Sequence, residues 1–306
     1  KSAGNDGGDN TANTSPLGGF TAYDKLTGFS TSKNNLVIAN ANDAVISSTG
    51  ALTSVTISGS SSQGPTDDLR IKPDLAGNGA SVYSTATLTN PVTPLTNSSY
   101  GNASGTSMAA PNVTGTLLLL QQLFFNNNSR YMRASTLKGL VCHTADDAGN
   151  PGPDANFGWG LLNSKRAAEA IIFNGLNSSI AENVLAQGQT YTYNVKSDGV
   201  NPLIASITWT DVPGPVNNGV LNDPTPVLVN DLDIRITQGT TTYFPWRLQS
   251  NATLNATRTG DNNVDNVEIV KIDAPTAGDY IITVTHKGTL QGGPQNYSLI
   301  AQNAPE

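Results

Sequence analysis

The hydrophobic pattern of the chain changes near residue 174, and this change restricts the possible folds more than any other feature. Before it, apolar residues recur with helical spacing over residues 107–125, 134–142 and 164–173, beside strand-like runs at 36–39 and 51–57. After it, short alternating runs separated by turn residues occupy 191–195, 204–209, 227–229, 267–270, 280–284 and 297–301. We therefore predict an α/β domain over residues 1–175, followed by an all-β sandwich or jelly roll over residues 176–306.

The segment Gly105-Thr106-Ser107-Met108-Ala109-Ala110-Pro111 places a serine at the start of the longest helical pattern. The N-terminus of a helix carries partial positive charge, and the small residues Gly105 and Ala109 let a substrate backbone come close. Pro111 is expected in the first turn, where its missing N–H costs no hydrogen bond. A hydroxyl in this position attacks a carbonyl once a base removes its proton. Residue type alone favours a simpler role for Ser107, that of a helix cap.

The complete seven-residue string resembles the nucleophile motif of the subtilisin-like serine proteases, the subtilases. It differs from the nucleophile elbow of α/β-hydrolases, because Ala109 stands where that elbow needs its second glycine. Further segments resemble subtilase segments in the order of that family, at residues 2–7, 32–38, 61–75 and 156–160. One departure is Ala76-Gly77-Asn78-Gly79, which stands where the family pattern has Ala-Pro-Gly.

The resemblance implies a subtilisin-like α/β fold with three layers around a parallel sheet, of which this chain holds the C-terminal part. It implies that Ser107 is the nucleophile and that the side-chain amide of Asn5, with the Ser107 N–H, holds the oxyanion. The implied substrate is a polypeptide lying as an extended strand in a cleft. The residues expected to bind it are Ala3, Gly4, Gly105 and Thr106.

A serine protease also needs a histidine as general base and an aspartate to orient that histidine. In subtilases both precede the oxyanion asparagine, so we expect them upstream of Lys1, in an N-terminal part of the same protein that partners this chain. His143 near Asp146 and Asp147 is an alternative dyad, although a histidine in the last turn of a helix is explained by the helix dipole. His286 lies in the second domain and is expected at the surface.

We therefore expect little or no hydrolysis by the chain alone. Two alternatives to the endopeptidase stay open. One is a catalytically incomplete scaffold or binding fragment, and the other is a different hydrolase such as an esterase.

The second domain resembles the C-terminal jelly-roll domain of certain bacterial alkaline subtilases, similar in outline to the P domain of kexin-like proteases. The matching segments are 207–211, 228–234, 261–268 and 293–299. Asp231 and Asp233 are two residues apart and share one face of a strand, and with Asp211 they offer the oxygen ligands that Ca²⁺ prefers. We predict a structural Ca²⁺ here, with residues 261–263 as a second candidate loop. The alternative is that these carboxylates are solvated or hydrogen-bonded in turns.

The composition excludes several classes of function. Only 16 of 306 residues are Lys or Arg and the formal net charge is −7, which leaves no basic stripe for nucleic acid. No run approaches the roughly 20 apolar residues of a membrane span. The single cysteine, Cys142, excludes an intrachain disulfide. The low charge and the family resemblance predict a secreted, extracellular protein, most consistent with a bacterial origin.

Overall fold

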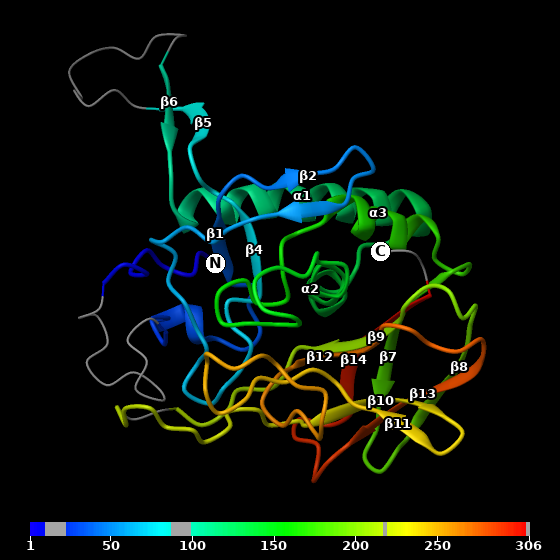
Figure 1. The fold of residues 1–306 in the computed structure, drawn as a ribbon. Coiled ribbons are helices and arrows are strands. Elements are labelled where there is room, and N and C mark those ends of the chain that lie inside the picture. The colour runs from blue at the N-terminus through cyan, green and yellow to red at the C-terminus, as the bar shows by residue number, and fades with distance from the viewer. Residues whose placement is uncertain (10–22, 87–98, 217–218, 304–306) are drawn as a thin grey trace.

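The computed structural model describes residues 1–9, 23–86, 99–216 and 219–303 (Figure 1). Its helical segments are η2 Gly28–Thr31, α1 Thr106–Asn128, α2 Ala134–His143 and α3 Ser164–Ile172. The strands before α1 are β1 Ile38–Ala41, β2 Val45–Ile46, β3 Leu52–Ser54, β4 Leu75–Asn78, β5 Val82–Thr85 and β6 Tyr100–Ala103. Those after α3 are β7 Ser178–Leu185, β8 Tyr191–Ser197, β9 Leu203–Trp209, β10 Leu232–Gln238, β11 Thr241–Tyr243, β12 Val267–Ile272, β13 Gly278–His286 and β14 Gln295–Asn303. Within the described ranges, no helix is long and apolar enough to cross a lipid bilayer.

The N-terminal part is built on parallel strand pairing that brings distant segments side by side. β1 and β4 pair in parallel, with Ile38 opposite Leu75. Parallel bridges extend this pair on both sides, from Ser2 to Ile38 and from Ala76 to Leu161. Helix α1 packs against both strands and α3 packs against α1, while β2–β3 and β5–β6 form separate antiparallel hairpins (Figure 1). The parallel sheet expected of an α/β domain is therefore present, and it places the first residues of the chain beside β1.

Two antiparallel four-stranded sheets make up the C-terminal part. Their strand orders are β11-β10-β13-β8 and β12-β9-β14-β7. The apolar residues of these strands form one core, in which Trp209, Tyr280 and Tyr297 are almost completely buried. All seven residues of β9 are buried, because α2 packs against β9 and β14 in addition to that core (Figure 1). The alternating pattern of the sequence is thus explained by sheets that pack face to face.

The two parts share apolar contacts across their boundary. Helix α3 ends at Ile172 and β7 begins at Ser178, so the change from helices to antiparallel strands falls between them. One buried cluster contains Ile38 from the first part together with Ile204 and Ile300 from the second. The division into domains of residues 1–175 and 176–306 stays a prediction.

The predicted helices are present, and α1 begins one residue earlier and ends three residues later than predicted. Residues 227–229 were predicted as a strand, and this prediction is wrong. The Val227 carbonyl accepts a hydrogen bond from Lys33 Nζ at 2.6 Å, and the Val227 N–H donates to Asp68 Oδ2 at 3.2 Å. Both backbone groups of Val227 that a sheet would use are therefore bonded to the N-terminal part instead.

Candidate active site

Ser107 is the second residue of α1 and lies exposed at the N-terminus of that helix. Gly105, immediately before the helix, has φ 145° and ψ 168°, a conformation in which any side chain would be strained. A Cβ atom on Gly105 would also lie 3.3 Å from Asn5 Oδ1. The glycine therefore permits both the abrupt start of α1 and the close approach of Asn5, and it leaves Ser107 at the positive end of the helix.

Pro111 lies in the second turn of α1 and not in the first, so that prediction is wrong. Because α1 begins at Thr106, Pro111 is its sixth residue. In an α-helix the N–H of this residue would donate to the carbonyl of Ser107, four positions earlier, but proline has no N–H. The Ser107 carbonyl therefore lacks its intrahelical donor.

Hydrogen bonds hold the Asn5 side chain beside the start of α1. Asn5 Oδ1 accepts from the Thr106 N–H and from Thr106 Oγ1, each at 3.0 Å. Thr106 Oγ1 in turn accepts from the N–H of Gly4 at 3.3 Å. Because these contacts engage the oxygen of the Asn5 amide, its Nδ2 remains available to donate to another group. Asn5 and Ser107, predicted from separate motifs, are thus brought together through Thr106.

Ala3 and Gly4 lie along the edge of the parallel sheet with their backbone groups already bonded. The Ala3 N–H donates to the Ile38 carbonyl and the Gly4 carbonyl accepts from the Ser62 N–H, both at 2.9 Å. The Gly4 N–H donates to Thr106 Oγ1. A substrate strand would need these N–H and C=O groups free. That substrate lies as a strand against Ala3 and Gly4 stays a prediction, and the Ala3 N–H and both backbone groups of Gly4 already have partners within the protein.

The loop after β4 contacts the start of α1. The Gly79 carbonyl accepts a hydrogen bond from the Gly105 N–H at 2.9 Å. A Cβ atom on Gly79 would lie 2.6 Å from both the Gly105 carbonyl oxygen and the Ala109 nitrogen, so no larger residue fits. The segment 76–79 departs from the family pattern, yet its last glycine still positions the residue before the helix.

His143 cannot serve as the base for Ser107. It is 4% exposed, and its Nδ1 hydrogen-bonds Ser206 Oγ at 2.8 Å. Burial, assisted by the charge of Arg166, lowers the pKa of His143 to about 3, so the ring stays neutral and enclosed. Asp146 forms an ion pair with Arg166 at 3.3 Å. The alternative dyad of His143 and Asp146 is therefore wrong, while His286 on β13 accepts a backbone N–H within the sandwich.

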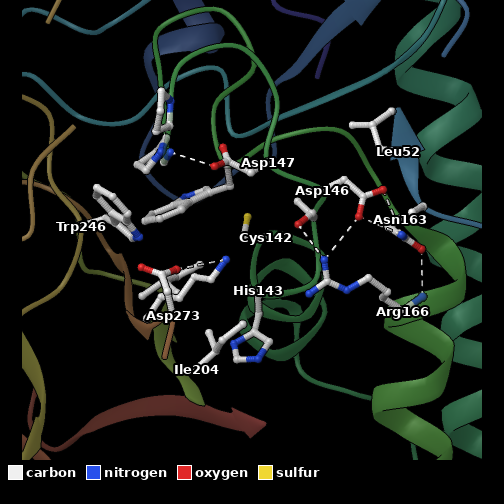
Figure 2. Close-up of a pocket in the computed structure, with 18 of the residues that line it drawn as sticks. Leu52, Cys142, His143, Asp146, Asp147, Asn163, Arg166, Ile204, Trp246 and Asp273 are labelled. Atoms are coloured by element: carbon white, nitrogen blue, oxygen red, sulfur yellow. Dashed lines mark hydrogen bonds and ion pairs between the residues drawn. The ribbon is translucent and has the colours of Figure 1, made fainter. Parts of the chain in front are cut away.

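The cavity shown in Figure 2 is separate from this site. It has a volume of about 660 Å³ and is lined by residues of α2, of the loop that follows it and of the sandwich, among them Cys142 and Trp246. Neither Ser107 nor Asn5 lines it. Burial raises the pKa of the Cys142 thiol well above its ordinary value, which keeps the sulfur protonated and unreactive. The cavity therefore offers no reactive thiol as an alternative to the candidate nucleophile Ser107.

The three aspartates predicted to bind Ca²⁺ each contact a lysine. Asp211 Oδ2 lies 2.5 Å from Lys33 Nζ, and both groups are buried. Asp231 and Asp233 both contact Lys287 Nζ, at 3.2 and 2.9 Å. In the part of the chain that the structure describes, no group of three or more His, Cys, Asp or Glu residues is arranged to hold a metal ion. The three aspartates therefore do not fit one calcium site, and calcium binding elsewhere in this protein stays a prediction.

Asp211 instead joins the two parts of the molecule. The Asn34 side chain donates to the Asp211 carbonyl at 2.8 Å and accepts from the Asp211 N–H at 2.9 Å. The Asp211 carboxylate also accepts the backbone N–H groups of Val229 and Asn230. These bonds attach the segment before β1 to the sandwich, a role that the sequence did not reveal.

A second buried ionic cluster lies around Asp74, immediately before β4. Asp74 Oδ2 lies 2.5 Å from Lys72 Nζ and accepts the Val37 N–H at 2.7 Å, while Asp74 Oδ1 lies 2.9 Å from Lys138 Nζ. All three ionisable side chains are almost completely buried. Burial lowers the pKa of Lys72 to about 7, although the charge of Asp74 opposes this shift. The cluster ties β1, β4 and α2 together through one carboxylate.

Comparison with known proteins gives one family. The sequence profile of the subtilase family matches residues 1–160, just over half of the chain. Over 71 residues the chain is 46% identical to an extracellular serine protease of Serratia marcescens, which covers 23% of this chain and 6% of that protein. Over 138 residues it is 29% identical to the PII-type proteinase of Lactococcus lactis subsp. cremoris, covering 40% of this chain and 7% of the relative.

Among solved structures, the patellamide maturation protease PatA is 18% identical, with a TM-score of 0.39, over 57% of this chain and 51% of that chain. With a TM-score of 0.39, this solved structure indicates neither the fold nor the function of the chain. The chain spans 6% of the length of the Serratia relative and 7% of the length of the Lactococcus relative.

Proposed function

The chain belongs to the subtilase family, and we propose that it supplies the nucleophile and the oxyanion donors of a secreted serine endopeptidase. The proposal rests on one observation: Thr106 fixes the Asn5 amide beside an exposed serine at the N-terminus of α1. The name of the Serratia relative supports secretion, which we propose for this protein as well. A polypeptide is the substrate that follows from the family.

In the proposed reaction, Ser107 Oγ attacks the carbonyl carbon of the scissile peptide bond while a histidine accepts its proton. The electron pair of the C=O double bond moves to the oxygen and gives a tetrahedral oxyanion. When this intermediate collapses, the C–N bond breaks and the histidine returns the proton to the leaving amine. The acyl group remains on Ser107 until a water molecule, activated by the same histidine, releases it as a carboxylic acid.

Two N–H donors are positioned for the oxyanion. One is Asn5 Nδ2, because the oxygen of that amide is engaged by Thr106. The other is the N–H of Ser107, which lies in the first turn of α1 where backbone N–H groups have no intrahelical acceptor. Fixed donors of this kind stabilise the negative charge that develops in the transition state more than they stabilise the neutral substrate carbonyl.

The histidine and its aspartate are proposed to come from an N-terminal part of the same protein, hereafter the Asp/His-bearing part. The exposed surface of α1 supports this proposal. Leu118 and Leu119 are 68% and 67% exposed, and a Cβ atom on Gly115 would meet nothing within 4 Å. Because α1 begins at the nucleophile, a partner that covers this helix also approaches Ser107.

For the C-terminal part we propose a jelly roll that braces the catalytic part. The strand order supports it, because β7, β9, β12 and β14 form one sheet while β8, β10, β11 and β13 form the other. The buried contact of Lys33 with Asp211 supports the bracing role.

The proposal is tested with a fluorophosphonate probe and a peptide hydrolysis assay. We expect residues 1–306 alone to show little labelling and little turnover. The protein that also contains the Asp/His-bearing part should be labelled at Ser107 and should cleave peptides. Absence of labelling at Ser107 in that protein would favour the non-catalytic scaffold, and turnover by the chain alone at the rate of the longer protein would contradict the proposed division of the site.

Replacing Asn5 tests the oxyanion donor directly. Asn5→Asp keeps an oxygen to accept from Thr106 but removes the N–H donor, so we expect kcat to fall by about 10²- to 10³-fold with KM little changed, a range known from the equivalent change in subtilisin. The assay uses the protein with its Asp/His-bearing part. Asp6→Asn, a change at the neighbouring exposed residue, serves as the control and should keep the parental rate. An Asn5→Asp variant with unchanged kcat would remove Asn5 from the mechanism.

A further inference from the structure

Four side-chain oxygens surround the ammonium group of Lys287, at the end of the sandwich where β10 begins and β13 ends. Lys287 Nζ lies 2.8 Å from Asn263 Oδ1, 2.9 Å from Asp233 Oδ1, 3.2 Å from Asp231 Oδ2 and 3.4 Å from Asp261 Oδ2. The Lys287 N–H also donates to the Asp231 carbonyl at 2.8 Å. The lysine head group is therefore bound by oxygens from the start of β10 and from the loop that holds Asp261 and Asn263.

The surroundings of this ammonium contain more acidic groups than the lysine can satisfy. Glu268 is completely buried, and only one of its carboxyl oxygens is bonded, to the Ile234 N–H. Its Oε1 and Asp231 Oδ1 are both buried without a hydrogen-bond partner. Arg235 is the second cation here and contacts Asp233 and Asp261.

The carboxylates of this cluster outnumber its cations. Burial raises the pKa of Glu268 well above its ordinary value. Among the described residues, Asp231, Asp233 and Asp261 form ion pairs with Arg235 and Lys287, which sets three carboxylates against two cations. The cluster already carries an excess of negative charge, and loss of Lys287 would increase it.

The oxygen set resembles what a divalent cation requires, but the observed distances suit an ammonium group. Ca²⁺ binds six to eight oxygens at about 2.3–2.6 Å, whereas N–H···O hydrogen bonds span about 2.7–3.2 Å. The shortest oxygen contact of Lys287 Nζ is 2.8 Å. Aspartate carboxylates and the side-chain carbonyl of Asn263 are nevertheless all ligand types that Ca²⁺ accepts.

We propose that the ammonium group of Lys287 occupies the position of a structural cation, so that this cluster needs no metal in the natural protein and gains a Ca²⁺ site when Lys287 is shortened. This inference concerns the sandwich alone and does not depend on the protease activity. It also gives a physical reason why Asp231 and Asp233, which look like calcium ligands in the sequence, do not form a calcium site in the structure.

The experiment compares thermal unfolding of residues 1–306 in excess CaCl₂ and in EDTA. In EDTA, Lys287→Ala should lower Tm by about 4 °C or more, because the neighbouring carboxylates lose their counter-ion. Calcium should restore most of this loss, since a ligand that binds only the folded state stabilises it. Lys287→Gln keeps a hydrogen-bond donor, so its Tm in EDTA should fall less than that of Lys287→Ala. Calcium should raise the Tm of this variant as well.

Two controls make the result specific. Lys271→Ala removes a lysine that contacts Asp273 outside this cluster, and it should create no calcium response beyond that of the parent. Asp231→Asn combined with Lys287→Ala should abolish the calcium-dependent rise in Tm. The proposal is wrong if neither Lys287 variant gains a calcium-dependent rise, or if neither folds in calcium. It is also wrong if the parent protein shows a rise in Tm that Asp231→Asn removes, because the metal would then bind with Lys287 in place.

Discussion

Ser107→Ala should abolish peptide hydrolysis by the protein that contains the Asp/His-bearing part, with a loss in kcat of about 10⁶-fold, the size known for nucleophile removal in subtilisin. Alanine has no Oγ, so no acyl intermediate can form. The remaining rate would come from substrate binding and from the oxyanion donors at Asn5 and residue 107. The measurement is kcat and KM on a chromogenic peptide, together with fluorophosphonate labelling.

Ser107→Ala should reduce catalysis without destabilising the fold. Ser107 is exposed, and within the described residues its hydroxyl forms no hydrogen bond that the fold would lose. Tm of Ser107→Ala should therefore stay within about 1–2 °C of the parent, as expected for a surface substitution. Ser54→Ala, on the exposed part of β3, is the matched control and should keep full activity. Hydrolysis that survives in Ser107→Ala at a tenth of the parental rate or more would assign the nucleophile to another residue.

The elements that carry Ser107, the proposed nucleophile, could be predicted from sequence because their determinants are local. Helix α1 follows from an apolar run after Gly105-Thr106-Ser107, and its observed bounds differ from the prediction by at most three residues. Ser107 and Asn5 were identified by the motifs around them, and the bonds from Thr106 to Asn5 show that these two motifs meet. What the motif could not give was the first residue of the helix. The helix begins at Thr106, which makes Pro111 its sixth residue.

The partners of charged residues could not be predicted, because the fold brings them together from distant segments. Lys33 and Asp211 are 178 positions apart, and nothing local to either residue indicates the contact. The same contact explains the error at 227–229, since the Val227 carbonyl also binds Lys33. Asp231 lies immediately before β10 and Asp233 within it, and the cation that both carboxylates meet is the ammonium of Lys287. Spacing along a strand shows which carboxylates lie together, and only the fold shows which cation neutralises them.

The largest effect on stability is expected from Asp74→Asn. This change would leave the buried ammonium groups of Lys72 and Lys138 without their shared carboxylate. Removing one partner from a buried ion pair costs about 3–5 kcal/mol, a large share of the roughly 5–15 kcal/mol that stabilises a typical domain. We therefore expect Tm to fall by about 10 °C, measured by differential scanning calorimetry. Asp279→Asn, at an exposed position of β13, makes the same chemical change outside the core and should leave Tm within about 1–2 °C of the parent.

The pH dependence of the stability loss in Asp74→Asn tests whether that loss is electrostatic. Lys72 has a pKa of about 7 in the folded protein and an ordinary value of 10.5 in the unfolded chain, so between these values the unfolded state binds more protons and stability rises with pH. Removing Asp74 lowers the folded-state pKa of Lys72 further. The difference in free energy of unfolding between parent and Asp74→Asn should therefore be largest at pH 6, where the parent still holds the proton, and smaller at pH 9, where Lys72 is neutral in both. Urea unfolding at the two pH values measures it. A difference that stays constant or grows with pH would show that the loss arises from packing or from the Val37 hydrogen bond and not from the unpaired lysines.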